Sequence, residues 1–338
     1  MLNMHMILFY FTLVSGTLIA SSSNSWIITW TGLEVNLLAL MPLMSNLNNK
    51  QSAEATIKYF LVQAMASAMF MFGALYYNHL TETSSHMFMS IPSSFIMYMA
   101  IMLKIGLAPF HFWLPEVTSG SSWKMIFIVL TWQKLAPMMI LYSIMPNPIL
   151  MSTIIMTSSM ISGIQGLNQT CMRKIMAYSS INHSSWMLAA MMISLNLWIC
   201  YFVVYFFINL SMILVMYKFN TNNIKQMNNL LNKNKLMKIT FMTNLLNLGG
   251  LPPFLGFLPK WLVIMELTEN NFKLLSFVLI IFTLVSLYFY IRITLATFSS
   301  NHEESLIKFF NKMKYPYLMM NSVLITSLAM CTILVSYL

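Results

Sequence analysis

Long apolar runs recur along almost the whole chain and limit what it can fold into. A helix needs about 20 mostly apolar residues to cross a hydrocarbon core about 30 Å thick, and the runs are close to that length. Only 8% of the residues are charged, whereas a typical soluble domain carries about 25%. Lipid must therefore solvate most of the outside of this chain, which predicts an all-α polytopic membrane protein.

The runs predict about eleven transmembrane helices, which we expect to form a single transmembrane domain over residues 1–338. The predicted spans are residues 3–20, 25–44, 55–78, 92–113, 123–144, 148–169, 174–193, 197–217, 239–266, 274–298 and 318–337. None shows the apolar and polar alternation of a membrane β-barrel strand. The first run lacks a basic leader, so we interpret it as a helix rather than a signal peptide.

Basic residues gather on one side of the membrane when the spans are counted from the N-terminus. The loops after even-numbered spans hold Lys50, Lys124, Arg173, Lys174, Lys218, Lys225, Lys233, Lys235, Lys238, Lys308, Lys312 and Lys314. The opposite loops hold Lys273 with Glu82, Glu266 and Glu269. The positive-inside rule then predicts an N-terminus in the matrix or cytoplasm and a C-terminus on the other side. Because the net charge of +10 follows this topology, we do not expect a nucleic-acid partner.

Charged residues inside the spans are the candidate functional residues. Glu34, Lys104 and Lys134 each lie about ten residues or more into a span, too deep for a side chain to reach the headgroups. A charge at that depth is costly, so it normally faces protein or a water-filled cavity. Lys260 follows an interruption in the ninth span. Lys58 is a weaker candidate, because pairing with Glu54 one turn before it would also explain its position.

Two of the predicted spans are interrupted by helix-breaking residues. The fourth span carries Pro109 and Pro115, and the ninth carries Gly249, Gly250, Pro252, Pro253, Gly256 and Pro259. Backbone groups freed by such a break are tolerated at membrane depth only beside protein or water. Broken helices with a lysine nearby are typical of ion-handling segments in transporters, although ordinary bending is the alternative for either one.

Lysine and glutamate at depth suit proton transfer. A lysine removed from water has its charged form disfavoured, so it can exchange a proton near neutral pH when a nearby charge moves. The four residues are therefore predicted to form a proton relay joined by water. His111, at the first break, and His183, among serines in the seventh span, are further relay candidates. A structural hydrogen-bonded histidine is the alternative for both.

The sequence predicts no redox cofactor or metal in this chain. Cys171, Cys200 and Cys331 are far apart, and no CxxC pair, GxGxxG motif or P-loop is present. The energy for proton movement would then come from outside the chain.

Several segments resemble the family of mitochondrial NADH dehydrogenase subunit 2, an N-type antiporter-like membrane subunit of respiratory complex I. They are SSNSWIITWTGLEVNLLALMPLM, EATIKYFLVQAMAS, KIGLAPFHFWLPEV, TWQKLAPM, MRKIMAYSSINHSSWM and LLNLGGLPPFLGFLPKW. They run in family order from residue 22 to residue 261. The 35 methionines and the abundant asparagines are similar to insect versions and suggest mitochondrial encoding.

The resemblance implies a fold, residue roles and partners. The fold is antiporter-like with two broken helices, without the three N-terminal helices of bacterial relatives. The family's glutamate falls on Glu34, and its lysines fall on Lys104, Lys134 and Lys260. NADH, FMN, iron–sulfur clusters and ubiquinone are implied in other subunits. The implied partners are core and accessory subunits of complex I, including neighbouring subunits 4 and 4L, and membrane lipids with cardiolipin as a candidate.

We therefore expect a proton-translocating subunit of complex I in the mitochondrial inner membrane, with the N-terminus in the matrix and the C-terminus in the intermembrane space. Two other functions remain open at this point. A structural scaffold would hold its buried charges in static ion pairs and would not pump. A stand-alone cation/proton antiporter would exchange ions without partner subunits.

Overall fold

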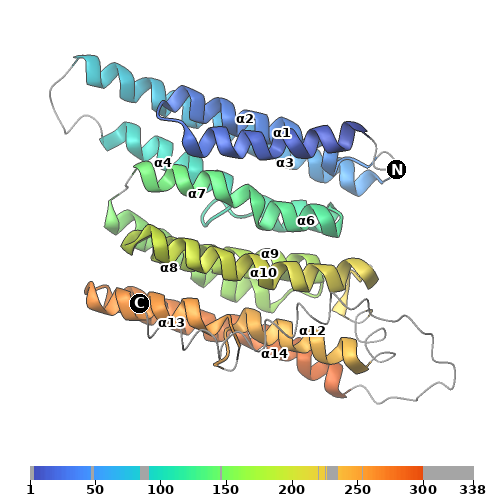
Figure 1. Cartoon of the computed structure of the whole chain (residues 1–338). Helices are drawn as coiled ribbons and strands as arrows, with labels where there is room; N and C mark the ends of the chain where they lie inside the picture. The colour runs from blue at the N-terminus through green and yellow to red at the C-terminus, as the bar shows by residue number, and fades with distance from the viewer. Residues whose placement is uncertain are drawn as a thin grey trace. The chain divides into compact units, whose positions relative to one another are not determined.

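The computed structural model of the chain describes residues 4–46, 49–83, 91–144, 147–219, 221–224, 226, 235–252 and 254–299. Every named element in these ranges is a helix (Figure 1). The helices are α1 (Met4–Ser22), α2 (Trp26–Met44), α3 (Lys50–Thr83), α4 (Ile91–Ile105), α5 (Trp113–Gly120), α6 (Trp123–Leu130), α7 (Trp132–Ile144), α8 (Pro148–Leu167), α9 (Met172–Ile193), α10 (Leu195–Phe219), α12 (Lys235–Gly249), α13 (Phe257–Glu269) and α14 (Lys273–Ser299). The predicted all-α fold is confirmed.

Each predicted span from 3–20 to 274–298 coincides with one of these helices or with a pair of them. The last predicted span, residues 318–337, lies outside the described residues. So do Lys225, Lys233, Pro253, Lys308, Lys312, Lys314 and Cys331. The side of the membrane on which each loop lies stays a prediction.

Seven described segments are long and apolar enough to cross a membrane. They are Met4–Ser22, Trp26–Met44, Lys50–His79, Trp123–Ile144, Pro148–Leu167, Leu195–Phe219 and Lys273–Ala296. The other predicted spans within the described residues are too short or too polar to be counted with these seven, and each has a physical reason for it. Two are divided into short half-helices, and α9 is buried on nearly all sides, so it can carry polar residues that a lipid-facing helix cannot.

The helices group into two compact units, residues 1–151 and 152–338. In the first unit, α3 packs against α2, α4 and α5, and α7 packs against α4 (Figure 1). In the second, α10 packs against α9, α12 and α13, and α14 packs against α12, α13 and α9. The single transmembrane domain expected from the sequence remains a prediction.

The fifth predicted span contains an interruption that the sequence analysis did not predict. It divides into α6 and α7 at Thr131, whose hydroxyl donates to the carbonyl oxygen of Phe127 at 2.6 Å. A threonine that bonds back to the preceding turn competes with the helical backbone and bends a helix. Pro137 adds to the bend, because it cannot donate to the carbonyl four residues earlier. Lys134 consequently lies in the first turn of α7 rather than inside a continuous helix.

Small residues let α1 and α2 approach closely. A Cβ atom added to Gly32 would lie 2.7 Å from the backbone nitrogen of Ala20 and 2.9 Å from its Cα atom. Close helix contacts of this kind are typical of membrane bundles, where dispersion rather than the hydrophobic effect holds helices together.

Gly32→Ala is predicted to weaken this contact, because the backbone of α1 must move away from the new methyl group. Overpacking of this kind costs about 1–3 kcal/mol. The matched control is Gly163→Ala, whose added Cβ meets its nearest atoms at 3.5 Å. Thermal inactivation of the detergent-solubilised assembly that contains each variant measures the difference. Equal midpoints for the two variants would contradict the prediction.

Candidate functional site

The break between α4 and α5 exposes backbone carbonyl groups, and side chains satisfy them. α4 ends at Ile105, and the next residue, Gly106, has φ +79° and donates its amide to the carbonyl oxygen of Met102 at 3.0 Å. A left-handed glycine is the usual way to end a helix. Trp113 Nε1 then donates to the Leu103 oxygen at 3.1 Å, and Gln63 Nε2 donates to the Lys104 oxygen at 3.3 Å. The break is therefore a fixed structure held from α3 and α5.

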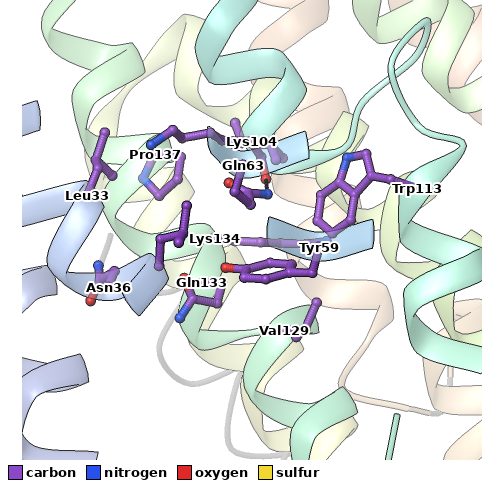
Figure 2. Close-up of a pocket in the computed structure, with 12 residues that line it drawn as sticks. Leu33, Asn36, Tyr59, Gln63, Lys104, Trp113, Val129, Gln133, Lys134 and Pro137 are labelled. Carbon is purple, nitrogen blue, oxygen red and sulfur yellow. Dashed lines mark hydrogen bonds between the residues drawn. The ribbon is translucent and has the colours of Figure 1, made fainter. Parts of the chain in front are cut away.

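Lys104 and Lys134 line one buried cavity beside this break (Figure 2). The cavity has a volume of about 20 Å³, and about 10–15 Å³ is enough for one water molecule. Its lining residues are Leu33, Asn36, Leu37, Tyr59, Gln63, Lys104, Ile105, Trp113, Val129, Gln133, Lys134 and Pro137. The two lysines are 6% and 2% exposed, so their charges lie away from both lipid and bulk water.

Two amide atoms in this cavity wall have unused hydrogen-bonding capacity. Within the described residues, Asn36 Oδ1 and Gln133 Nε2 are buried and have no hydrogen-bond partner. A buried unsatisfied polar atom costs about 1–3 kcal/mol, and ordered water is the usual partner of such atoms. The cavity is therefore polar as well as large enough for water.

Glu34 is an acidic group that acts on Lys104, one of these two lysines. It lies near the middle of α2, as predicted, and is partly buried. Its carboxylate attracts the Lys104 ammonium group electrostatically. The salt bridges among the described residues both involve Lys58, and none joins Glu34 to Lys104. The Glu34 carboxylate and the Lys104 ammonium therefore attract each other without direct contact.

The second break, between α12 and α13, places Lys260 against backbone oxygens. Gly250 has φ +76° and follows the end of α12 as Gly106 follows the end of α4. The Lys260 ammonium donates to the Gly249 oxygen at 2.9 Å and to the Leu248 oxygen at 3.4 Å. Asn247 Oδ1 accepts from the Gly256 amide at 2.7 Å. A cation at the C-terminal end of a helix is favoured by the helix dipole, which supplies the negative end that a carboxylate would otherwise provide.

The proline inside each of the two half-helices was expected to break a helix, but neither of them does. Pro115 and Pro259 are both the third residue of a helix, α5 and α13. The amide of a residue in the first turn has no acceptor within the helix, so proline is tolerated there. Pro115 therefore does not break its helix, and the break lies before Trp113.

His183 is held in a buried polar cluster of the second unit. His183 Nδ1 lies 2.9 Å from the Tyr201 hydroxyl, and its ring centroid is 5.1 Å from that of Tyr205. Beside it, Asn182 Nδ2 donates to the Ser286 hydroxyl at 2.9 Å. His111 lies in the first break, 1% exposed, with its ring 4.2 Å from that of Phe112. These contacts agree with both interpretations of the histidines, relay and structural.

Lys58 has the partner that the sequence predicted and a second one that it did not. Its ammonium lies 2.7 Å from Glu54 Oε1 on the same helix and 2.9 Å from Glu116 Oε2 on α5. The side chains remain 41%, 66% and 56% exposed in the order Lys58, Glu54, Glu116. Lys58 therefore lies outside the cavity of Lys104 and Lys134, although it is adjacent to Tyr59, which lines that cavity.

The structure brings Lys104 and Lys134 together at one cavity of the first unit, where Glu34 attracts Lys104. It places His183 and Lys260 in the second unit. Several site residues were missed because they are uncharged. Tyr201, Tyr205 and Asn209 recur every four residues on α10 and are at most 2% exposed. That spacing is a polar stripe on one helix face, which the sequence analysis could have found.

Relatives with known names identify the chain. Residues 23–287 match the family described as NADH:quinone oxidoreductase/Mrp antiporter, TM. NADH-ubiquinone oxidoreductase chain 2 of Anopheles gambiae is 41% identical over 333 residues, which cover 97% of each chain. The protein of that name in Locusta migratoria is 40% identical over 309 residues, which cover 90% of this chain and 88% of the relative. The chain belongs to the NADH-ubiquinone oxidoreductase chain 2 family. The resemblance stated from the sequence is confirmed.

Solved structures share the fold of this chain 2 family member. A chain of respiratory complex I from Thermus thermophilus with bound aureothin has a TM-score of 0.86 and 23% identity, over 98% of this chain and 79% of that one. A chain of the Mrp complex from Dietzia sp. DQ12-45-1b has a TM-score of 0.79 and 15% identity, over 95% and 74%. The antiporter-like fold predicted from the sequence is therefore confirmed.

Gly256→Ala is predicted to disrupt the second break, because the added Cβ would collide with the backbone oxygen of Asn247. We expect the folded state to lose about 3 kcal/mol of stability, which is at the upper end for overpacking. The yield of assembled complex should therefore be low. Gly249→Ala is the matched control, since its Cβ meets the nearest atom at 3.6 Å. Native gel electrophoresis of membranes measures assembly. Normal assembly of the Gly256 variant would show that the break is not rigid.

Proposed function

We propose that this chain moves protons across the membrane as a subunit of respiratory complex I. The observation that carries the proposal is the cavity shared by Lys104 and Lys134 in the interior of an apolar helical unit. Two lysines at a water-sized polar cavity are costly to keep and serve no packing need. Membership of the chain 2 family supports the same role.

Proton transfer would pass between the two lysines through water. An ammonium group of one lysine gives a proton to the water while the water gives another to the neutral amine of the second lysine. One N–H bond breaks, one N–H bond forms, and the water is unchanged. Glu34 would favour the protonated form of Lys104, so a change at Glu34 would set the direction. Lys260, with His183 and His111 as weaker candidates, would extend the relay.

The remaining chemistry is proposed to lie in other subunits. NADH oxidation and ubiquinone reduction, with FMN and iron–sulfur clusters, would supply the energy, and this chain would bind no cofactor or metal. We place it in the mitochondrial inner membrane with the N-terminus in the matrix and the C-terminus in the intermembrane space. Neighbouring subunits 4 and 4L are the proposed contacts, and cardiolipin is a proposed lipid.

Lys134→Met and Glu34→Gln are predicted to impair pumping in the assembled complex. Methionine keeps the apolar bulk of lysine and removes its proton, and glutamine keeps the shape of glutamate. Loss of a positioned proton-transfer group slows the step about 10²–10⁴-fold, so we expect at least roughly tenfold slower pumping. The initial rate of proton uptake into proteoliposomes measures it. Lys273→Met, at an exposed lysine, is the control. Pumping equal to that of the control would exclude the proposed role.

A structural scaffold is the second candidate, and the contacts of Lys260 favour it. An ammonium group that caps the carbonyl oxygens of Leu248 and Gly249 can be a static part of a helix end. Lys260→Gln separates the two roles, because the amide can still donate to these oxygens but cannot transfer a proton. The scaffold role predicts unchanged pumping in this variant. The relay role predicts assembled complex with reduced pumping.

A further inference from the structure

The two breaks share a sequence pattern with the same spacing. Residues 106–116 read GLAPFHFWLPE and residues 250–260 read GLPPFLGFLPK, which gives G-L-x-P-F-x-x-x-L-P followed by a charge. Glu116 ends the first copy and Lys260 ends the second. A repeat of this kind in two separated segments indicates equivalent structural elements.

The structure agrees with the repeat at the two glycines and at the helix ends. α4 ends at Ile105 and α12 ends at Gly249, immediately before the two left-handed glycines, Gly106 and Gly250. α5 begins at Trp113 and α13 begins at Phe257, which are equivalent positions in the pattern. Glu116 and Lys260 are therefore both the fourth residue of the half-helix that follows a break.

We infer that Glu116 is a relay residue of the first unit, in the position that Lys260 has in the second, and that it exchanges protons while paired with Lys58. The inference rests on the proposed function, since it adds a member to the same proton path. It assigns a role to a carboxylate that the sequence analysis did not select, and to Lys58 as its partner.

The contacts of Glu116 connect it to the cavity of Lys104 and Lys134. Its partner Lys58 lies on α3, next to Tyr59 in the cavity wall. One turn further along α3, Gln63 holds the carbonyl oxygen of Lys104. Trp113, three residues before Glu116, holds the oxygen of Leu103 and lies against the Tyr59 ring at 5.9 Å. A change in the Lys58–Glu116 contact would therefore affect Gln63 and Trp113, the two side chains that support the break.

The charges of this group allow it to take up one proton. Lys58 is shared by two carboxylates, so the three side chains carry one excess negative charge. A proton added to the Glu116 carboxylate leaves a neutral acid beside a complete Lys58–Glu54 pair, and its release restores the original state. The Glu116 side chain is 56% exposed in this chain, whereas Lys260 is 6% exposed.

Glu116→Gln tests the inference in the assembled complex. Glutamine can still accept a hydrogen bond from Lys58, so it preserves a purely structural contact, but it cannot take up a proton. We expect normal assembly, a roughly tenfold loss of pumping rate, and loss of any carboxylic acid band that Glu116 contributes to infrared difference spectra during turnover. Glu269→Gln, at an exposed glutamate of α13, is the matched control.

The outcomes separate this inference from the function on which it rests. If Glu116→Gln pumps like Glu269→Gln while Lys134→Met does not pump, the role of Glu116 is wrong and the proton path through the lysines stands. If Lys134→Met also pumps normally, the proposed function itself fails. If Glu116→Ala prevents assembly but Glu116→Gln assembles and pumps fully, Glu116 is only a structural contact and the inference is overturned.

Discussion

The structure depends on how the backbone is satisfied where a helix stops inside an apolar environment. In water, a broken helix exposes its carbonyl groups to solvent at little cost. In hydrocarbon each unsatisfied group costs several kcal/mol, so a break survives only if the protein supplies partners. At the first break Trp113 and Gln63 supply them, and at the second Lys260 does. The residues around each break are therefore fixed by this need as much as by any proton chemistry.

The same constraint explains why charged residues lie where they do. A broken helix brings its own polar groups and those of its neighbours to the interior, so a charge placed there has dipoles to interact with. Lys260 uses the carbonyl end of α12 directly. Lys104 lies in the last turn of α4, with Glu34 as the acidic group that attracts it. The two units thus use different negative groups for a buried lysine, a helix end in one and a carboxylate in the other.

The repeat at 106–116 and 250–260 connects these observations. The two equivalent breaks are followed by residues of opposite charge, Glu116 and Lys260. A different neighbouring group binds each of them. Lys58 on α3 holds the carboxylate, and the backbone of α12 holds the ammonium group. A lysine at position 116 would repel Lys58, so the sign of the charge at each break follows from its neighbour.

The sequence by itself determined the helical membrane fold, both predicted helix breaks and the place of Glu34 near the middle of its helix, because lipid solvent and helix geometry act on each segment separately. It also identified Glu54 as the partner of Lys58, since residues four apart on one helix are neighbours wherever that helix packs. It could not give the contact between Lys58 and Glu116, the support of the Lys104 carbonyl by Gln63, or the cavity shared by Lys104 and Lys134. Only the tertiary structure decided these, because each depends on which face of one helix meets which face of another. A single sequence with apolar residues on most helix faces does not encode that choice locally.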